Sequence, residues 1–211
     1  MRKLACTVVL CCLAAVPAFA QGGGASGGMA GGAQAGPPAD PLSTFVKGQW
    51  RQISNNLIGS AEQMPEANYN MKLGTMPEVR TYGSLLGHVI DANFLFCARA
   101  KGEANPNTVD YEHTPQVKAD LVKAMHAAVD YCHPVYDALT DASSMELVMP
   151  PANPQGGGRG NPRPYPRIQP LIQNIIHNNE EYGNIVGYFR AANLVPPSTA
   201  AAAARGGGRG N

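Results

Sequence analysis

The sequence predicts an all-α protein, an antiparallel four-helix bundle with flexible segments at its N- and C-terminal ends. Three observations lead to this fold class. Apolar residues recur three and four positions apart in four segments of about 20–25 residues, which is the spacing of one helix face. These segments show no strand-like alternation, and stretches rich in proline or glycine separate them. Four amphipathic helices of this length bury their apolar faces by packing against one another.

Residues 1–20 have the composition of a secretory signal peptide. Arg2 and Lys3 precede an apolar run over residues 4–16, and small residues lead to a predicted cleavage site after Ala20. Such a segment is removed on export, so the mature protein is expected to be periplasmic or secreted. Three of the five cysteines would be removed with it, namely Cys6, Cys11 and Cys12.

The rest of the chain divides into three parts by composition. Residues 21–39 form a linker rich in glycine and alanine, residues 40–195 form the bundle, and residues 196–211 form a tail of alanine, glycine and arginine. The linker and the tail carry too little apolar surface to offset the entropy of ordering, so both are expected to be flexible. No later apolar run reaches the ~20 residues that cross a bilayer, so stable membrane insertion is not expected.

The charge balance limits the classes of partner. The full chain has 16 Lys and Arg against 15 Asp and Glu, and removal of residues 1–20 leaves 14 against 15, a net charge of −1. A near-neutral protein lacks the positive field that attracts nucleic acid, so no nucleic-acid partner is expected. A small-molecule substrate is compatible with this composition, and the oligomeric state stays open, a homodimer included.

The first helix is predicted over residues 42–63. Asp40 followed by Pro41 is typical of a helix N-terminus, because the aspartate can cap the first turn and the proline ring already holds the helical φ. The apolar pattern then continues until Pro65 ends it. Residues 65–78 contain two prolines and a glycine and are expected to form a loop.

The second and third helices follow from similar signals. The second is predicted from residue 79 or 81 to residue 100, where Lys101-Gly102 ends it. Thr114-Pro115 repeats the arrangement of a capping residue followed by proline, and the third helix is predicted from there to about residue 139. Pro134 falls inside that span and cannot donate a backbone hydrogen bond, so a kink or an early end is expected there.

A long connection and a fourth helix complete the predicted bundle. Residues 140–166 are rich in proline and glycine, which argues against a helix. The fourth helix is predicted over residues 168–193 and is ended by Pro196 and Pro197. Because the connections differ in length, the bundle is expected to be less symmetric than a pair of helical hairpins.

Two cysteines remain in the predicted mature chain, Cys97 and Cys132. Outside the cytoplasm thiols are under oxidising conditions, which favours a disulfide between them. The alternative is two unrelated buried thiols, which a cytoplasmic protein would favour.

The fourth helix carries a candidate pair of metal ligands, His177 and Glu181. Residues four apart on a helix share a face, so an imidazole and a carboxylate can point to one place. His88 on the second helix is the best candidate for a third ligand. The alternatives are a solvated polar face for the pair and a core-edge histidine for His88. The pair also lies about 120° from the centre of its helix's apolar stripe, so another element must cover that side.

Two stretches resemble the metal-binding helices of the DinB/YfiT-like superfamily. They are Gly-Ser-Leu-Leu-Gly-His-Val-Ile-Asp-Ala-Asn, which contains His88, and His-Asn-Asn-Glu-Glu-Tyr-Gly-Asn-Ile-Val-Gly-Tyr-Phe-Arg, residues 177–190. The resemblance covers residues 41–195 in helix order. It implies a DinB-like four-helix bundle that holds a divalent metal with one histidine from the second helix and a His-x3-His pair from the fourth. His88 and His177 match two of these positions, while Glu181 stands where the second histidine of the pair is expected.

The resemblance also implies a function. Two histidines and a carboxylate suit Zn, Ni, Mn or Fe(II) and leave open coordination positions. Known activities in the superfamily include thiol-dependent transferases, so a metal-dependent transferase or hydrolase of unknown substrate is expected. Asp91 is expected to orient a ligand, and Tyr182 or Asn184 to line the pocket. The alternative is a non-catalytic extracytoplasmic bundle that binds a partner or small ligand and has a degenerate metal site.

A competing cluster lies on the third helix, where His126, Asp130 and His133 share one face. This face is opposite the apolar stripe of the helix, so the sequence favours a solvated surface over a second metal site.

Overall fold

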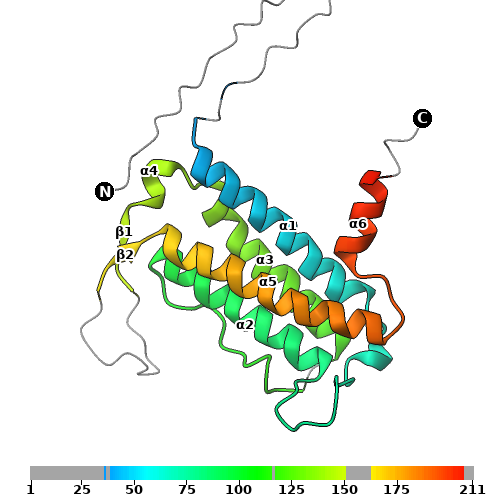
Figure 1. Ribbon diagram of the computed structural model, residues 1–211. Helices are drawn as coiled ribbons and strands as arrows, with labels where there is room; N and C mark the ends of the chain where they lie inside the picture. The colour runs from blue at the N-terminus through cyan, green and yellow to red at the C-terminus, as the bar shows by residue number, and fades with distance from the viewer. Residues whose placement is uncertain (1–35, 37–38, 116, 151–162, 207–211) are drawn as a thin grey trace, which may run out of the picture. The chain divides into compact units, whose positions relative to one another are not determined.

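A computed structural model describes residues 36, 39–115, 117–150 and 163–206 of this protein, and four long helices packed as a bundle make up most of this described part (Figure 1). The long helices are α1 Pro41–Gln63, α2 Tyr82–Lys101, α3 Lys118–Asp137 and α5 Ile168–Ala191. The shorter elements are the 3-10 helix η1 Glu66–Asn68, the helices α4 Asp141–Ser144 and α6 Pro197–Gly206, and the strands β1 Leu147–Val148 and β2 Tyr165–Pro166. The predicted all-α four-helix bundle is confirmed. The predicted signal peptide and most of the predicted linker lie outside the described residues.

The helix directions differ from the antiparallel bundle that was expected. α1 packs against α3 and α5, and α2 packs against the same two helices. α1 and α3 are antiparallel, because Arg51 in the first half of α1 pairs with Asp137 at the end of α3. α2 and α3 are parallel, because Cys97 near the end of α2 meets Cys132 near the end of α3. Parallel neighbours cannot be joined by a tight turn, and the described part of the connection, residues 102–115, runs back along α2.

The N-terminus of α1 is capped from another helix. Asp40 occupies the predicted cap position, but its side chain makes no capping hydrogen bond to α1. Instead the carboxylate of Asp141 in α4 accepts hydrogen bonds from the backbone N–H of Ser43 at 2.7 Å and of Leu42 at 3.3 Å. Asp40 Oδ1 in turn accepts from the N–H of Asp141 at 2.9 Å. The two aspartates therefore exchange capping bonds and join the start of α1 to the start of α4.

Two predictions for α3 are corrected by the structure. The helix begins at Lys118 rather than at Thr114-Pro115, because the N–H of Thr114 bonds to the carbonyl of Asp110 and closes a separate turn. Pro134 lies inside α3, so of the kink or early end predicted there, the early end does not occur. A proline costs a helix one hydrogen bond, and the packing of α3 against two other helices outweighs that loss.

Part of the tail that was predicted to be flexible forms a helix. Residues 197–206 make up α6, which begins with Pro197 and contains an alanine run. Both features favour a helix, since proline is well tolerated at the first position and alanine has the highest helix propensity. Pro197 is buried close to Gly59 of α1, and the N–H of Ser198 donates to the Tyr182 hydroxyl at 2.9 Å. The prediction for these ten residues was therefore wrong, and residues 207–211 lie outside the described part.

The predicted connection between α3 and α5 has structured ends. α4 follows α3 directly, and β1 pairs with β2 in antiparallel register, Leu147 opposite Pro166 and Val148 opposite Tyr165. Residues 151–162 between the two strands lie outside the described residues. The short strand pair brings the chain back to the start of α5.

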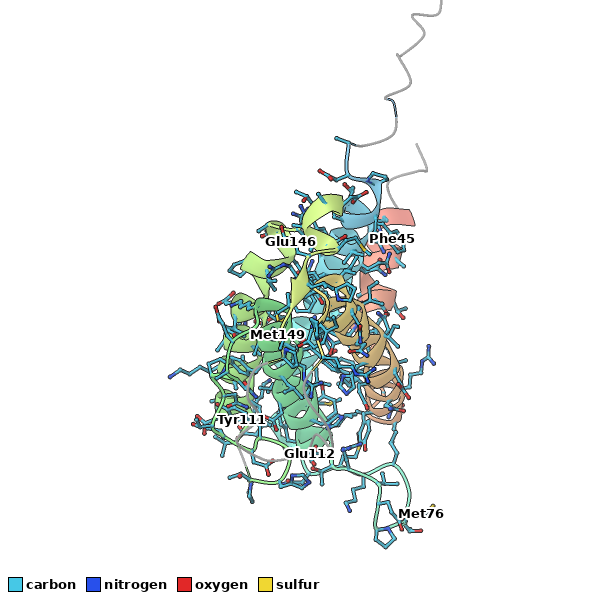
Figure 2. All side chains as sticks on the ribbon, turned by 90° about the vertical axis from the view of Figure 1, so that its left-hand side faces the viewer. Phe45, Met76, Tyr111, Glu112, Glu146 and Met149 are labelled. Carbon is cyan, nitrogen blue, oxygen red and sulfur yellow. A yellow bond between two sulfur atoms is a disulfide. The ribbon has the colours of Figure 1, made fainter. Side chains whose placement is uncertain are left out.

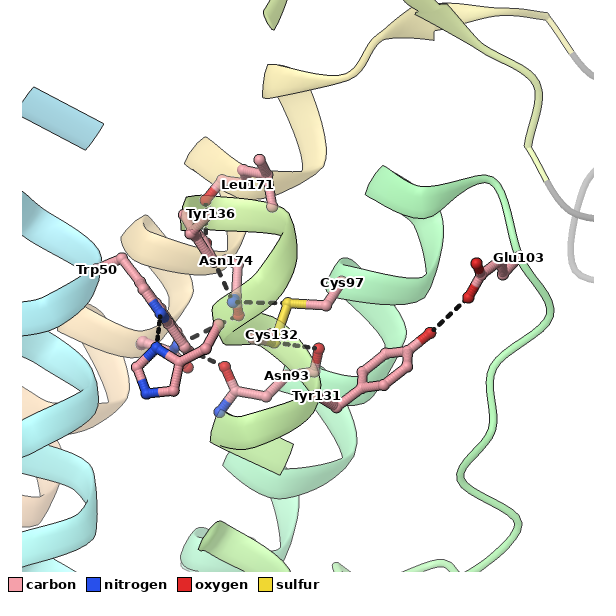
Figure 3. Close-up of a disulfide and its surroundings, with 11 residues drawn as sticks. Trp50, Asn93, Cys97, Glu103, Tyr131, Cys132, Tyr136, Leu171 and Asn174 are labelled. Atoms are coloured by element: carbon pink, nitrogen blue, oxygen red, sulfur yellow. Dashed lines mark hydrogen bonds between the residues drawn. A yellow bond between two sulfur atoms is a disulfide. The ribbon is translucent and has the colours of Figure 1, made fainter. Parts of the chain in front are cut away.

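The disulfide predicted between Cys97 and Cys132 is present and joins α2 to α3 (Figure 3). Both residues are fully buried. Beside the bridge, the Asn174 side-chain amide of α5 donates to the Tyr136 hydroxyl at 3.3 Å, and that hydroxyl donates to the carbonyl of Leu171 at 2.9 Å. The bridge therefore lies at a point where three of the four long helices meet.

An aromatic pair lies in the core between α1 and α3. The Trp50 ring stacks on Tyr136 with 4.4 Å between centroids, and both side chains are fully buried. Stacked rings of this kind add to the free energy gained from burying their apolar area. Within the described residues, no helix combines the length and the apolar character that a bilayer crossing needs.

Candidate metal centre

Three predicted ligands, His88 on α2 and His177 and Glu181 on α5, converge in the structure. The Nε2 atoms of the two histidines are 3.0 Å apart, and Nε2 of His88 is 3.7 Å from Oε1 of Glu181. One donor atom from each residue lies within 4.8 Å of the other two. The three side chains therefore surround a common point between the antiparallel helices α2 and α5.

The convergence depends on the position of α2. His177 and Glu181 are one helical turn apart on α5 and lie away from the centre of its apolar stripe. α2 covers this side of α5, so Glu181 is only 9 % exposed, and the His177 ring lies 5.8 Å from the Phe96 ring of α2. The side chain of His88 keeps 25 % of its surface exposed, so the centre can be reached from solvent.

His88 is held by a residue that the sequence analysis did not identify, Glu112. Its Oε2 lies 2.7 Å from Nδ1 of His88, and its Oε1 accepts from Nε of Arg80 at 2.7 Å. Burial raises the pKa of the Glu112 carboxyl, but the hydrogen bonds from Arg80 and His88 outweigh burial and hold this pKa below its ordinary value. Glu112 is therefore ionised at neutral pH. It lies in an irregular connection outside any ligand-spacing motif, so no sequence signal pointed to it.

His177 has the electrostatic character that a metal ligand needs. Burial, and next the nearby His88 ring, lower the pKa of His177 below its ordinary value, while the Glu181 carboxylate opposes them. The imidazole is therefore neutral at neutral pH, and only a neutral imidazole has a lone pair to give to a metal.

The three residues predicted to support the site lie at different distances from it. The Asn184 side-chain amide donates to Oε2 of Glu181 at 3.0 Å, which leaves Oε1 turned toward His88. The Asp91 carboxylate touches no ligand and accepts from the backbone N–H of Glu112 at 3.1 Å. Tyr182 points toward α6, where its hydroxyl accepts from the N–H of Ser198. Of the three, Asn184 is the one whose side chain hydrogen-bonds to a candidate ligand.

The competing cluster on α3 does not converge. Nε2 of His126 pairs with Oε1 of Glu62 at 2.8 Å, and Nδ1 of His133 accepts from Nε1 of Trp50 at 3.2 Å. Asp130 is exposed. The two histidines therefore pair with different residues of α1, and in the described part of the chain the one group of potential metal ligands is His88, His177 and Glu181.

Two of the three donor spacings are compatible with a shared divalent cation. Metal–nitrogen and metal–oxygen bonds of about 2.1 Å place two donors roughly 3.0 Å apart at a 90° angle and roughly 3.6 Å apart at 120°. The observed 3.0 Å and 3.7 Å agree with these values. Two imidazoles and one carboxylate form a donor set that binds Zn, Ni, Mn or Fe(II).

Comparison with known proteins agrees with the fold. No curated protein matches this chain. Among solved structures, a DinB-like protein from Bacillus cereus matches with a TM-score of 0.56 at 15 % identity, over 73 % of this chain and 95 % of that one. A conserved protein from Enterococcus faecalis matches with a TM-score of 0.51 at 15 % identity, over 71 % and 95 %. At this identity both matches show the fold alone.

The family model supplies the assignment. The model of the DinB superfamily matches residues 49–180, which is more than half of the chain. The matched span contains His88 and His177 and ends one residue before Glu181. The resemblance noted from the two helical stretches is thereby confirmed, and this chain belongs to the DinB superfamily.

Proposed function

We propose that this protein is an exported member of the DinB superfamily that binds a divalent metal ion through His88, His177 and Glu181 and uses it in a transferase or hydrolase reaction on a small molecule. The observation that supports the metal site is the approach of three donor atoms to within 4.8 Å. Export is supported by the composition of residues 1–20 and by the disulfide, a bond that persists in oxidising compartments. No nucleic-acid partner and no membrane insertion enter this proposal, and a homodimer is compatible with it.

The three candidate ligands would bind the metal ion directly. Each candidate ligand supplies one donor: Nε2 of His88, Nε2 of His177 and Oε1 of Glu181. Bound there, a divalent ion would act as a Lewis acid that activates a water molecule or a small thiol. Three protein ligands leave coordination positions open for such a molecule, and the partial exposure of His88 gives it a route from solvent.

Metal binding is tested on protein purified without an affinity tag, stripped with a chelator and titrated with Zn, Ni, Mn and Fe(II) in turn. We expect one ion per chain by elemental analysis and its loss in His88→Ala. His126→Ala is the matched control, because it removes a partly exposed helix histidine that pairs with Glu62 away from the centre. Absence of stoichiometric binding for all four ions would refute the metal site and leave a non-catalytic bundle.

The role of Glu181 can be tested with a control variant in the neighbouring residue. Glu181→Gln keeps the shape of the side chain but removes the charge that attracts the cation, so affinity should fall at least about tenfold, the loss that even outer contacts of a metal site cause. Glu180→Gln makes the same change one residue away on the exposed side of α5 and should leave affinity unchanged. Equal affinities for the two variants would remove Glu181 from the ligand set.

Activity is tested separately on the loaded protein. Transfer of a small thiol to an electrophilic acceptor and hydrolysis of an activated ester are the two reactions to assay. The proposal requires a rate that disappears on chelation and in His88→Ala but persists in His126→Ala. A protein that binds metal stoichiometrically yet shows neither reaction would contradict the catalytic half of the proposal.

A further inference from the structure

The connection between α2 and α3 is fastened to one face of α2. Ser84 donates from its hydroxyl to the carbonyl of Glu112 at 2.8 Å, and Asp91 accepts from the N–H of the same residue at 3.1 Å. Asn107 donates to the other oxygen of Asp91 at 2.8 Å, which ties an earlier part of the connection to the same carboxylate. Side chains of α2 therefore hydrogen-bond to both the carbonyl and the N–H of Glu112. Figure 2 shows Tyr111 and Glu112 beside the ribbon of α2.

Gly87 explains how the connection approaches so closely. A Cβ atom at this position would lie 2.1 Å from the carbonyl oxygen of Tyr111 and 2.8 Å from the nitrogen of Glu112. Both are backbone atoms, so the connection would have to move away. Glycine weakens a helix relative to alanine, and its position here, on the same face as Ser84 and Asp91 and next to His88, coincides with the backbone contact. On this face of α2, Ser84 and Asp91 hold the connection, and Gly87 between them leaves room for its backbone.

The close approach of the connection to α2 places the Glu112 carboxylate beside His88 in the metal centre. With Oε2 of Glu112 at 2.7 Å, Nδ1 of His88 donates its hydrogen to the carboxylate. In the tautomer with the hydrogen on Nδ1, the lone pair is on Nε2, the atom that faces His177 and Glu181. Arg80 holds the other oxygen, and the Glu112 side chain is only 17 % exposed, so the carboxylate has little freedom to turn away. A carboxylate behind a ligating histidine fixes its tautomer and ring orientation.

We propose that Glu112 is the positioning residue of the metal centre: it holds His88 in the Nδ1–H tautomer with Nε2 directed at the cation, and Gly87 admits the backbone that carries it. The proposal rests on His88 acting as a ligand. It adds two residues, one in an irregular connection and one glycine without a side chain, to a site otherwise built from helix side chains.

The tautomer is measured on metal-free protein, which separates this test from the test of metal binding. Histidine labelled with nitrogen-15 distinguishes the two neutral tautomers of His88 by long-range proton–nitrogen correlation at about pH 8, well above the ordinary histidine pKa. We expect the Nδ1–H form in the natural protein and in Glu112→Gln, whose amide oxygen can still accept. Glu112→Ala should give a mixture. A single Nδ1–H form in Glu112→Ala would overturn the proposal whether or not metal binds.

Metal affinity provides the second readout. Glu112→Ala should weaken Zn binding by about 10–100-fold, and Glu112→Gln should recover part of that loss because it keeps the hydrogen bond but not the charge. Glu103→Ala is the control, since Glu103 is an exposed carboxylate in the same connection whose contact is with Tyr131. An unchanged affinity in Glu112→Ala, in a protein that loses metal in His88→Ala, would refute the positioning role while leaving the metal site in place.

Gly87→Ala tests the backbone contact without altering any polar group. It should shift the His88 tautomer and lower Zn affinity in the same direction as Glu112→Ala, because the displaced connection takes the carboxylate with it. Gly48→Ala in α1 is the matched control, since nothing lies within 4 Å of a Cβ atom there. A folded Gly87→Ala protein with natural tautomer and affinity would show that the close approach is dispensable. If Gly87→Ala does not fold, the Glu112 variants still decide the proposal.

Discussion

Breaking the disulfide should cost this protein a large part of its stability. Cys97 and Cys132 are 35 residues apart in sequence, and both are fully buried between α2 and α3. In the oxidised chain the bridge restricts the unfolded state to conformations in which these two positions stay together. Reduction removes that restriction, so the unfolded state gains entropy and the free energy of unfolding falls.

The magnitude follows from the length of the closed loop. With a separation of 35 residues, the chain-entropy relation gives about 4 kcal/mol at 25 °C. Urea m-values for small proteins are roughly 1–3 kcal/mol/M, so the unfolding midpoint should move by about 1.3 M or more. Such a shift is far larger than the uncertainty of a denaturation curve.

The assay is urea denaturation of the natural protein with and without a reductant, followed by circular dichroism. The control is the double variant Cys97→Ala/Cys132→Ala, in which the reductant should have no effect. Intact mass after alkylation checks the bond itself: unreduced protein should carry no blocked thiols at these two positions. A reductant-induced loss below about 1 kcal/mol would refute the loop-entropy reasoning, because it is a small fraction of the value that loop length gives.

Two further predictions concern the ends of helices. Hydrogen bonds from the N–H groups of Ser43 and, more weakly, Leu42 hold the pKa of Asp141 below its ordinary 3.8. The stabilisation it gives is present above that value and is lost as the pH falls through the lowered pKa, so thermal melts of the natural protein and of Asp141→Asn should converge on acidification; a constant gap down to about pH 2 would contradict this. Gly102 ends α2 at φ +73°, and a Cβ atom there would lie 2.8 Å from Val148. Gly102→Ala should therefore lower the free energy of unfolding by about 1 kcal/mol or more in urea denaturation, and equal stability would argue against it.

The parts of the fold that depend on local pattern could be predicted from the sequence. Apolar spacing located all four long helices. Gly102 marked the end of α2, because a helix often ends at a residue with left-handed backbone angles and glycine adopts these angles readily. The meeting of His88 with His177 and Glu181 was predicted through the resemblance to a known family, since periodicity alone placed the α5 pair off the apolar stripe. Spacing along one helix cannot show which other element covers that face.

The parts that depend on distant contacts could not be predicted. Asp40 was a correct choice for the cap position, yet the capping oxygen comes from Asp141, 101 residues away. Glu112 carries no signal in sequence because its role depends on where an irregular connection is fastened. The predicted direction of α3 relative to α2 was wrong for a related reason. Helix patterns do not state direction, and the expectation of antiparallel neighbours fails when a connection is long enough to run back along α2.

Buried amides tie α2 to α5 beside the disulfide. The Asn178 amide on α5 donates to Oδ1 of Asn93 on α2 at 2.8 Å and to Oδ1 of Asn174 at 3.2 Å, and Asn174 in turn contacts the sulfur of Cys97 at 3.7 Å. All three asparagines are fully buried. A buried amide without a partner is costly, so sliding α2 along α5 by one residue would break these bonds and be opposed. Apolar packing alone would tolerate such a slip more readily. The amides therefore fix the register in which His88 faces His177, and the disulfide anchors α2 beside the same amides.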